Sequence, residues 1–306
     1  MSDQAADGGF RHAAWLYRAS AEYLRGIREF VQAALARSEP VFVVIPRSQV
    51  PDGWLPSGPG VTVADMKDLG GNPARLIPAL RAFADRYPGR RVRYLGEPAW
   101  AGRSSAELRE TARYEALLNR AFADAEINAL CPYNAAELSA AVMADACGAH
   151  PTLHGAGSER ANADYRGPAV WPDSLTKPLL APATAQVLSY DGDLRPVRAL
   201  VASVAAEAGL PPGQCTDLVI AASEVAANTL RHTSGGGVIR LWETAAEVLC
   251  QVEDTGYIRD PLAGHWRPAG DLVGGQGLWL VNQVCDLAEI RSSELGTTIR
   301  LHMYRR

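Results

Sequence analysis

Hydrophobic and polar positions in the first half of the chain follow two alternating patterns. Between Ser20 and Ala36, apolar residues recur every three or four positions, which predicts an amphipathic helix. Val41–Ile45 is instead an unbroken run of β-branched and aromatic residues between two prolines, typical of a strand buried on both faces. Further helices are predicted over 75–86, 107–125 and 135–146, and a second strand over 92–95. Alternating strands and helices predict an α/β domain with a parallel sheet.

The pattern changes after a stretch without periodicity. Residues 156–186 are rich in Pro, Ala, Gly and polar residues, and we interpret them as a linker. Beyond the linker, helices are predicted over 195–208, 214–230 and 278–284, and strands over 238–242, 248–253, 289–291 and 298–303. Helices on one face of a mostly antiparallel sheet form an α+β two-layer sandwich. The predicted domains are therefore 1–155 and 187–306.

Charge, polarity and cysteine usage exclude several classes of protein. The chain has 30 Lys and Arg against 34 Asp and Glu, so it lacks the basic excess of a nucleic-acid-binding protein. Its polar start is unlike a secretory signal, and no apolar run is long enough to span a membrane. Five cysteines without CxxC spacing argue against a disulfide framework. We therefore expect a cytoplasmic protein with reduced thiols, without nucleic acid or membrane as a partner.

A polar pair stands on the second helix predicted for the last region. Glu224 and Asn228 are four residues apart, so both side chains share one helical face. Such a pair can hold Mg²⁺ through the amide oxygen of Asn228, while the Glu224 carboxylate acts as a general base. The alternative is an ordinary polar helix face.

A short acidic motif follows the strand predicted over 248–253. Asp254 at the strand end can accept a hydrogen bond from an exocyclic amine such as that of adenine. Gly256, two positions later, lets the backbone approach a flat ring closely. The alternative for this motif is a simple turn after a strand.

Glycines next precede a helix, and a threonine pair precedes the last strand. Gly274, Gly275 and Gly277 lead directly into the predicted helix, where backbone N–H groups suit phosphate oxygens. No lysine stands in the arrangement of a P-loop, so that motif is excluded. A threonine hydroxyl in Gly296-Thr297-Thr298 could support adenine recognition directly or through water; the alternative is an ordinary strand residue.

In this order and spacing, the motifs resemble the GHKL-type ATPases with the Bergerat fold, and most closely the anti-sigma-factor serine/threonine kinases. The resemblance covers roughly residues 187–306. It implies Glu224 as catalytic base, Asn228 as Mg²⁺ ligand, and Asp254 and Gly256 around adenine. It further implies a phosphate lid of Gly274, Gly275 and Gly277 followed by Leu278, with His232 near the lid and Thr298 beside Asp254.

The resemblance also implies a function. Relatives bind Mg-ATP and sequester a sigma factor or phosphorylate a Ser or Thr on an antagonist with a STAS fold, and they commonly form homodimers. The chain departs from the pattern at Ile258, where the family often has glycine, and it lacks the histidine-bearing helix of two-component kinases. A second hypothesis is therefore a nucleotide-gated binding switch without kinase activity.

Residues 10–155 resemble the MEDS sensory domain. The resemblance rests on FRHAAWLY near the start, GEPAW, YEALLNRAF, LCPYN and AHP. It implies a RecA-like α/β fold that senses a small molecule. The loop after Val41–Ile45 lacks phosphate-binding glycines and lysine, so ATP is not expected in this half.

Polar and aromatic residues of these motifs are candidates for a sensor pocket. We predict that the pocket is lined by His12, Glu97, Trp100, Glu115, Asn119, Cys131, Tyr133 and His150. The alternative places Trp100 and Tyr133 in the core, and Glu115 and Asn119 on a helix surface.

Thiols and imidazoles near the end of this region raise a third hypothesis, a metal or redox sensor. The candidate zinc ligands are Cys131, Cys147, His150 and His154. Their spacing is not that of a zinc finger, and Pro151 interrupts any helical face that could pair the histidines. Buried, inert thiols are the alternative.

Overall fold

The computed structural model describes residues 9–55, 57–155, 158–168, 175–267 and 276–306. The chain divides into two compact units, Met1–Ser174 and Leu175–Arg306. Each unit has its own sheet and its own hydrophobic core. Among the described helices, none is both long enough and apolar enough to cross a membrane.

The first unit is built on a seven-stranded sheet in the order β3-β2-β4-β5-β1-β6-β7. Its strands are β1 (Arg11–Tyr17), β2 (Val41–Ile45), β3 (Val61–Asp65), β4 (Val92–Gly96), β5 (Ile127–Asn134), β6 (Thr152–Gly155) and β7 (Ser158–Ala161). Neighbouring strands are parallel except β6 and β7, which are antiparallel. The parallel-rich sheet confirms the α/β class predicted for this half.

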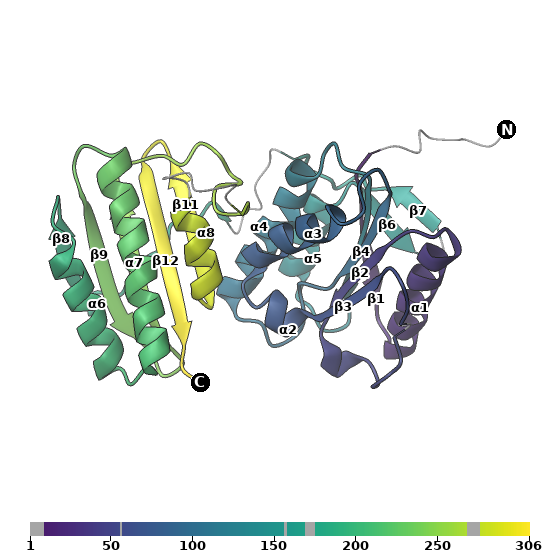
Figure 1. The fold of residues 1–306 in the computed structure, drawn as a ribbon, viewed down its shortest axis with the longest axis horizontal. Helices are drawn as coiled ribbons and strands as arrows, with labels where there is room; N and C mark the ends of the chain where they lie inside the picture. Colours follow the sequence, from purple (N-terminus) through teal and green to yellow (C-terminus); the bar gives the residue numbers. More distant parts are fainter. Residues whose placement is uncertain (1–8, 56, 156–157, 169–174, 268–275) are drawn as a thin grey trace. The chain divides into compact units, whose positions relative to one another are not determined.

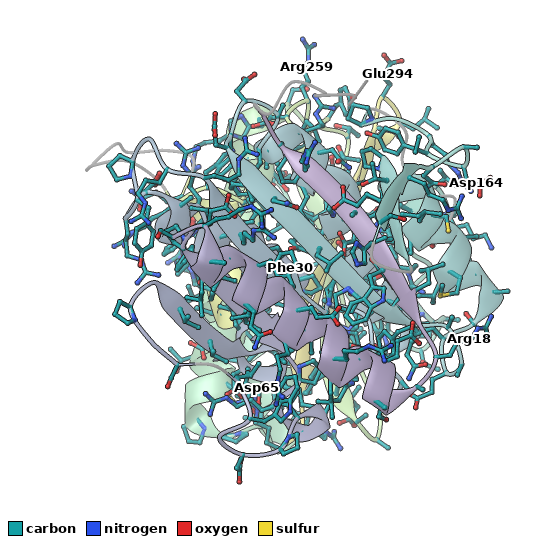
Figure 2. The ribbon with its side chains drawn as sticks, turned by 90° about the vertical axis from the view of Figure 1, so that its right-hand side faces the viewer. Arg18, Phe30, Asp65, Asp164, Arg259 and Glu294 are labelled. Carbon is teal, nitrogen blue, oxygen red and sulfur yellow. The ribbon has the colours of Figure 1, made fainter. Side chains whose placement is uncertain are left out.

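Helices of the first unit cover both faces of the sheet. They are α1 (Ser20–Ala36), α2 (Met66–Leu69), α3 (Leu76–Ala84), α4 (Ser105–Ala121) and α5 (Ala140–Ala149), with two 3₁₀ turns, Arg47–Gln49 and Pro73–Arg75. On β1, Trp15 packs toward α1, whereas Ala14 packs on the opposite face with residues of α5. Figure 2 shows α1, labelled at Phe30, lying across the strands. All five residues of β2 are buried, as the continuous apolar run predicted.

The second unit has an antiparallel sheet of five strands in the order β11-β12-β10-β9-β8. Its strands are β8 (Gln186–Tyr190), β9 (Gly237–Glu243), β10 (Glu247–Asp254), β11 (Leu287–Ser293) and β12 (Gly296–Tyr304). Its helices are α6 (Arg195–Glu207), α7 (Pro212–His232) and α8 (Gly277–Val284). The core of this unit is formed by apolar residues of these helices and of the strands beneath them (Figure 1).

The segment predicted as a linker contributes structure to both units. Ser158–Ala161 forms β7 and extends the first sheet. Leu179 and Leu180 belong to the second unit, where their carbonyl oxygens accept hydrogen bonds from Gln251 at 3.2 Å and Arg300 at 3.0 Å. The boundary between the compact units follows Ser174.

Candidate functional site

A cavity of about 620 Å³ opens in the second unit beside α7, α8 and the end of β10. This volume lies within the range typical of small-molecule sites, roughly 300–1,000 Å³. Its described lining combines apolar walls with a few polar groups: Val225, Asn228, Thr229, His232, Thr233, Asp254, Gly256, Tyr257, Ile258, Asp260, Leu262, Ala263, Gly264, Trp266, Gly277, Leu278, Thr297 and Ile299.

Asp254 is held in place at the end of β10 by two donors. Thr229 Oγ1 donates to one carboxylate oxygen at 2.7 Å, and the Gly256 backbone N–H donates to the other at 2.7 Å. Each carboxylate oxygen can accept a further hydrogen bond. Asp254 therefore offers a fixed acceptor to the cavity, as recognition of an exocyclic amine requires.

The atoms packed around Gly256 leave little space for a side chain. A Cβ atom at this position would lie 2.9 Å from Thr233 Cγ2 and 3.0 Å from an Asp254 carboxylate oxygen. The first distance is shorter than real Cβ contacts and the second is tight, so a larger residue would push against Thr233 and crowd Asp254. The close approach of backbone and cavity expected at this glycine is thus built into the fold.

Of the two adjacent threonines on β12, Thr297 and not Thr298 lines the cavity. The register of β10 and β12 pairs Asp254 with Thr297, whereas Thr298 pairs with Glu253. Thr297 Oγ1 donates to Gly256 O at 2.8 Å and lies 2.7 Å from Ser292 Oγ. The sequence predicts Thr298 beside Asp254, but in the structure Thr297 takes this place. Thr298 faces the other side of the sheet, because neighbouring residues of a strand point to opposite faces.

Glu224 and Asn228 face the start of α8. A Cβ atom at Gly277 would lie 2.9 Å from Glu224 Oε2 and 3.0 Å from Asn228 Nδ2, so the helical pair and the last glycine of the cluster meet. Asn228 lines the cavity, and its Oδ1 accepts a hydrogen bond from Arg231 at 2.9 Å. Glu224 lies one helical turn away from Asn228, outside the described lining.

The remaining predicted lid residues are partly described. Gly274 and Gly275 lie outside the described residues, whereas Leu278 and His232 line the cavity. Ile258, which replaces a family glycine, adds an apolar wall to the same cavity.

The loop before α8 is fastened to that helix. Asn282 Nδ2 donates to Gly264 O at 3.1 Å. Gly264 has a φ of +83° and lies against Leu278, so a side chain there would be strained and would clash. The loop and α8 therefore close one side of the cavity together.

Thr229 is a functional residue that the sequence patterns do not single out. It is 1% exposed, on the buried face of α7, where its neighbours at helical spacing are Val225 and Ala226. A hydroxyl among apolar neighbours is the available signal, because a buried polar group needs a partner. Its partner is Asp254.

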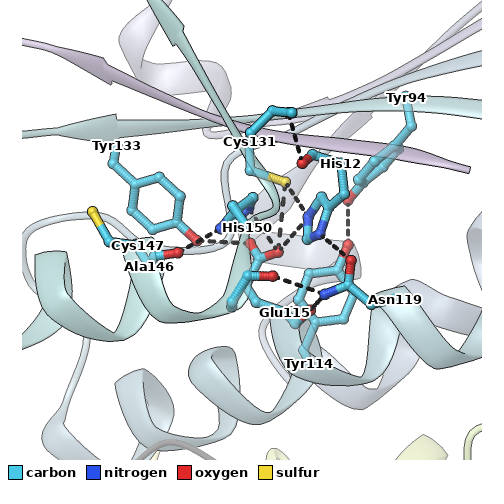
Figure 3. A network of polar contacts seen from close by, with 12 residues as sticks. His12, Tyr94, Tyr114, Glu115, Asn119, Cys131, Tyr133, Ala146, Cys147 and His150 are labelled. Carbon is cyan, nitrogen blue, oxygen red and sulfur yellow. Dashed lines mark hydrogen bonds and ion pairs between the residues drawn. The ribbon is translucent and has the colours of Figure 1, made fainter. Parts of the chain in front are cut away.

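The first unit contains a second polar site, which is shown in Figure 3. Side chains from β1, α4, β5 and the end of α5 converge beneath the sheet and are almost completely buried. Six of the predicted sensor residues belong to this cluster: His12, Glu115, Asn119, Cys131, Tyr133 and His150.

Glu115 is the centre of the cluster. Its Oε2 lies 3.0 Å from His12 Nε2 and 3.4 Å from His150 Nε2. The same oxygen is 3.6 Å from Cys131 Sγ, which in turn is 3.4 Å from His12 Nε2. Tyr133 OH donates to the other carboxylate oxygen at 2.9 Å. The His12 and His150 imidazoles and the Cys131 thiol are therefore packed closely around Glu115 Oε2.

Burial and mutual interaction shift the titration of these groups. Burial, reinforced by His150, lowers the pKa of His12 to about 4. Burial alone would raise the pKa of Glu115, but the adjacent imidazoles of His150 and His12 hold it well below its usual range. Burial raises the pKa of the Cys131 thiol well above its usual value.

Glu97 and Trp100 make other contacts. Glu97 is fully buried and accepts hydrogen bonds from Tyr17 OH at 2.7 Å and from Tyr23 OH, on the side of the sheet that α1 covers. Burial raises the pKa of Glu97 to about 8. The Trp100 ring lies 3.8 Å from the Arg103 guanidinium carbon. The predicted sensor residues thus separate into different environments.

Two family models match the chain. Residues 11–151 match the MEthanogen/methylotroph, DcmR Sensory domain, abbreviated MEDS, and residues 189–303 match the histidine kinase-like ATPase domain. The chain joins a MEDS domain to a histidine kinase-like ATPase domain. The MEDS domain and the histidine kinase-like ATPase domain inferred from the sequence motifs are confirmed. The buried cluster lies within the MEDS domain, and the cavity beside Asp254 lies within the ATPase domain.

Among solved structures, the chain is similar to the crystal structure of the RsbU and RsbW domains of a Mycobacterium tuberculosis protein. The sequence identity is 23% and the TM-score is 0.31. The similarity covers 41% of this chain and 34% of that chain, so this chain spans about a third of that structure's length. A search of curated proteins found no match.

Proposed function

We propose that the ATPase domain binds Mg-ATP in the cavity beside Asp254 and acts as an anti-sigma regulatory kinase controlled by the MEDS domain. The observation that carries the proposal is the fixed carboxylate of Asp254, which faces a cavity of nucleotide size next to a glycine where a side chain would crowd Thr233 and Asp254. Apolar residues such as Ile258 and Ile299 suit the faces of an adenine ring, while Asp254 accepts from its exocyclic amine.

The other end of the site suits phosphate and magnesium. Gly277 begins α8, and helix N-termini favour phosphate oxygens. Asn228 Oδ1 would serve as a ligand of Mg²⁺, which when bound neutralises charge on the phosphates. Arg231 donates to the same oxygen at 2.9 Å, which leaves the second lone pair of Oδ1 for the ion.

Glu224 is the proposed catalytic base. Its carboxylate stands beside Gly277 and Asn228, close to the proposed phosphate end of the site. In phosphoryl transfer it would accept the proton of the attacking hydroxyl of a partner's Ser or Thr. By family resemblance that partner is an antagonist with a STAS fold, and the domain also sequesters a sigma factor.

The MEDS domain is the proposed sensory input. Its signal would be a small molecule, and only a ligand that binds two states of the protein with different affinity can change the output.

Calorimetric titration of Mg-ATP into the full chain tests nucleotide binding. Wild-type protein should bind one nucleotide per chain, and Asp254→Asn should weaken binding by about 10- to 100-fold, the loss of one charge-assisted hydrogen bond. Asn228→Ala should weaken the binding of Mg-ATP more than it weakens the binding of metal-free ATP, measured in excess chelator. A control at the neighbouring, partly buried strand residue, Thr298→Val, should bind like wild type. Absence of binding to wild-type protein would refute the proposal.

Phosphate transfer separates the kinase from the nucleotide-gated switch. The switch has one specific observation in its favour, the positive charge of Arg231 at 2.9 Å from Asn228 Oδ1, which opposes a cation at that oxygen. Radiolabelled ATP and a STAS-domain protein are incubated with wild-type chain and with Glu224→Ala. Transfer that Glu224→Ala abolishes, without loss of ATP binding, supports the kinase. ATP-dependent complex formation without transfer supports the switch.

A further inference from the structure

Four potential metal ligands converge in the MEDS domain. They are His12 of β1, Glu115 of α4, Cys131 of β5 and His150 at the end of α5 (Figure 3). One ligand atom from each residue lies within 4.8 Å of all the others, and all four residues are buried. Imidazole nitrogen, thiolate sulfur and carboxylate oxygen are the ligands of zinc and related transition metals.

The spacing of these atoms fits one small cation. A tetrahedral site with metal–ligand bonds of about 2.0–2.3 Å places its ligand atoms roughly 3.4 Å apart. From Glu115 Oε2, His12 Nε2, His150 Nε2 and Cys131 Sγ lie at 3.0, 3.4 and 3.6 Å. His12 Nε2 and Cys131 Sγ are 3.4 Å apart. Little movement is needed to place an ion at their centre.

The outer nitrogens of both imidazoles are held by acceptors. His150 Nδ1 lies 2.7 Å from the carbonyl oxygen of Ala146, which can only accept, so Nδ1 carries the hydrogen. His12 Nδ1 lies 3.2 Å from Asn119 Oδ1, and Asn119 is oriented by its donation to Ala149 O at 2.8 Å. Such partners orient imidazoles that bind metals.

The Nε2 atoms of His12 and His150 both face the same oxygen of the Glu115 carboxylate. His150 Nε2 is fully buried and makes no hydrogen bond, although Glu115 Oε2 is 3.4 Å away. Lone pairs directed at a carboxylate oxygen repel it unless a proton or a cation stands between them. With the Cys131 sulfur beside them, the cluster has the composition of a cation site.

We propose that His12, Glu115, Cys131 and His150 bind a divalent transition-metal ion, Zn²⁺ in the first place, at a four-ligand site inside the MEDS domain. The site goes beyond the proposed nucleotide function and does not depend on it. Four protein ligands close a tetrahedral shell, as in structural zinc sites, so the ion would tie β1, α4, β5 and the end of α5 together. Glu115 would be oriented by Tyr133, which donates to its second oxygen.

The ligand set differs from the zinc hypothesis that the sequence suggested. Cys131 and His150 remain, but Cys147 and His154 are replaced by His12 and Glu115. The His154 ring lies edge-on to Trp15, with ring centroids 6.3 Å apart. Cys147 is a partly exposed thiol on α5 and is the matched control for Cys131.

The test is a Co²⁺ titration of the metal-free full chain, followed by absorption spectroscopy. Wild-type protein should bind one Co²⁺ per chain, with the ligand-field bands of a tetrahedral ion and a thiolate-to-cobalt charge-transfer band, and Zn²⁺ should displace it. Cys131→Ser should remove the charge-transfer band and weaken Co²⁺ binding by more than about a hundredfold, beyond the loss typical of an outer-shell partner. Cys147→Ser should leave both unchanged.

Three results would overturn the proposal: no stoichiometric Co²⁺ on wild-type chain, a charge-transfer band that survives in Cys131→Ser, or one that disappears in Cys147→Ser. Circular dichroism checks that the variants are folded. If Cys131→Ser does not fold, X-ray absorption of the zinc-loaded wild-type chain decides without any variant. A first shell with one sulfur and two imidazoles supports the site, and a shell without sulfur refutes it.

Discussion

Glu97 is a carboxyl group that the fold keeps in its neutral form. It is fully buried against Tyr17 and Tyr23, and burial raises its pKa to about 8. The hydroxyls of both tyrosines donate to it, which lessens the shift without reversing it. Since an unfolded chain ionises this group at its ordinary pKa of 4.5, folding must compete with ionisation at neutral pH.

Glu97→Gln should therefore remove a pH-dependent loss of stability. Between pH 4.5 and 8 the folded state retains a proton that the unfolded chain releases, so the free energy of unfolding falls as pH rises. The slope from this group is up to about 1.4 kcal/mol per pH unit. Glutamine imitates the neutral carboxyl, and the variant should gain stability over wild type progressively across this window.

Chemical unfolding of both proteins at several pH values measures the difference. The exposed Glu29 on α1 provides the control, because Glu29→Gln should leave the pH dependence of wild type unchanged. A constant difference between Glu97→Gln and wild type from pH 5 to pH 8 would contradict the neutral assignment.

At the scale of single elements, β12 decides which threonine serves the cavity. Successive strand residues point to opposite faces, and the pairing of Asp254 with Thr297 directs Thr297 inward. Its hydroxyl supports the backbone carbonyl of Gly256 at 2.8 Å. The partly buried Gly256 carbonyl would lose this partner if the hydroxyl were removed.

Thr297→Val and Thr298→Val are a matched pair that tests this register. Thr297→Val keeps the shape of the side chain but leaves Gly256 O without its hydroxyl donor, a cost of about 1–3 kcal/mol. The adenine end of the site should loosen, and the Kd for Mg-ATP should rise about tenfold. Thr298→Val should change it less than about twofold. Equal effects in calorimetry would show that the cavity does not bind adenine beside Asp254.

Elements with strong periodicity could be predicted from the sequence. Ser20–Ala36 has the predicted bounds because its apolar residues follow one helical period, and Val41–Ile45 because it is a continuous apolar run. The strands β1 and β5 were not predicted, since His12, Cys131 and other residues of the polar cluster interrupt the continuous apolar run typical of strands buried on both faces. The polar cluster thus obscured the elements that carry it.

Residues that act together within one short motif could be predicted from the sequence. Residues that are brought together by strand pairing could not. Asp254 and Gly256 stand in one short motif, so their joint role could be inferred from local spacing. Thr297 faces Asp254 only through the register of β10 and β12, two strands that do not follow one another in the chain. His12 and His150 lie near opposite ends of the MEDS domain and meet only because β1 pairs with β5 and β6.

At the scale of the whole molecule, the two domains have separate cores and separate candidate ligand sites. Separate sites do not by themselves make a regulated kinase. Regulation requires a coupling free energy, typically about 1–3 kcal/mol, between an event in the MEDS domain and nucleotide binding in the ATPase domain. Thermodynamic linkage makes such coupling reciprocal, which provides a strict test.

If metal occupancy of the MEDS domain is part of the input, the Kd for Mg-ATP should differ between metal-loaded and metal-free chain by about 5- to 150-fold. The Kd for Co²⁺ must then change by the same factor when saturating Mg-ATP is present. Calorimetry measures the Kd for Mg-ATP, and cobalt absorption independently measures the Kd for Co²⁺. Cys131→Ser should abolish the effect of metal on the Kd for Mg-ATP. Identical ATP affinities in the two metal states would show that the ion stabilises the MEDS fold without signalling, because a ligand that does not distinguish two states cannot shift them.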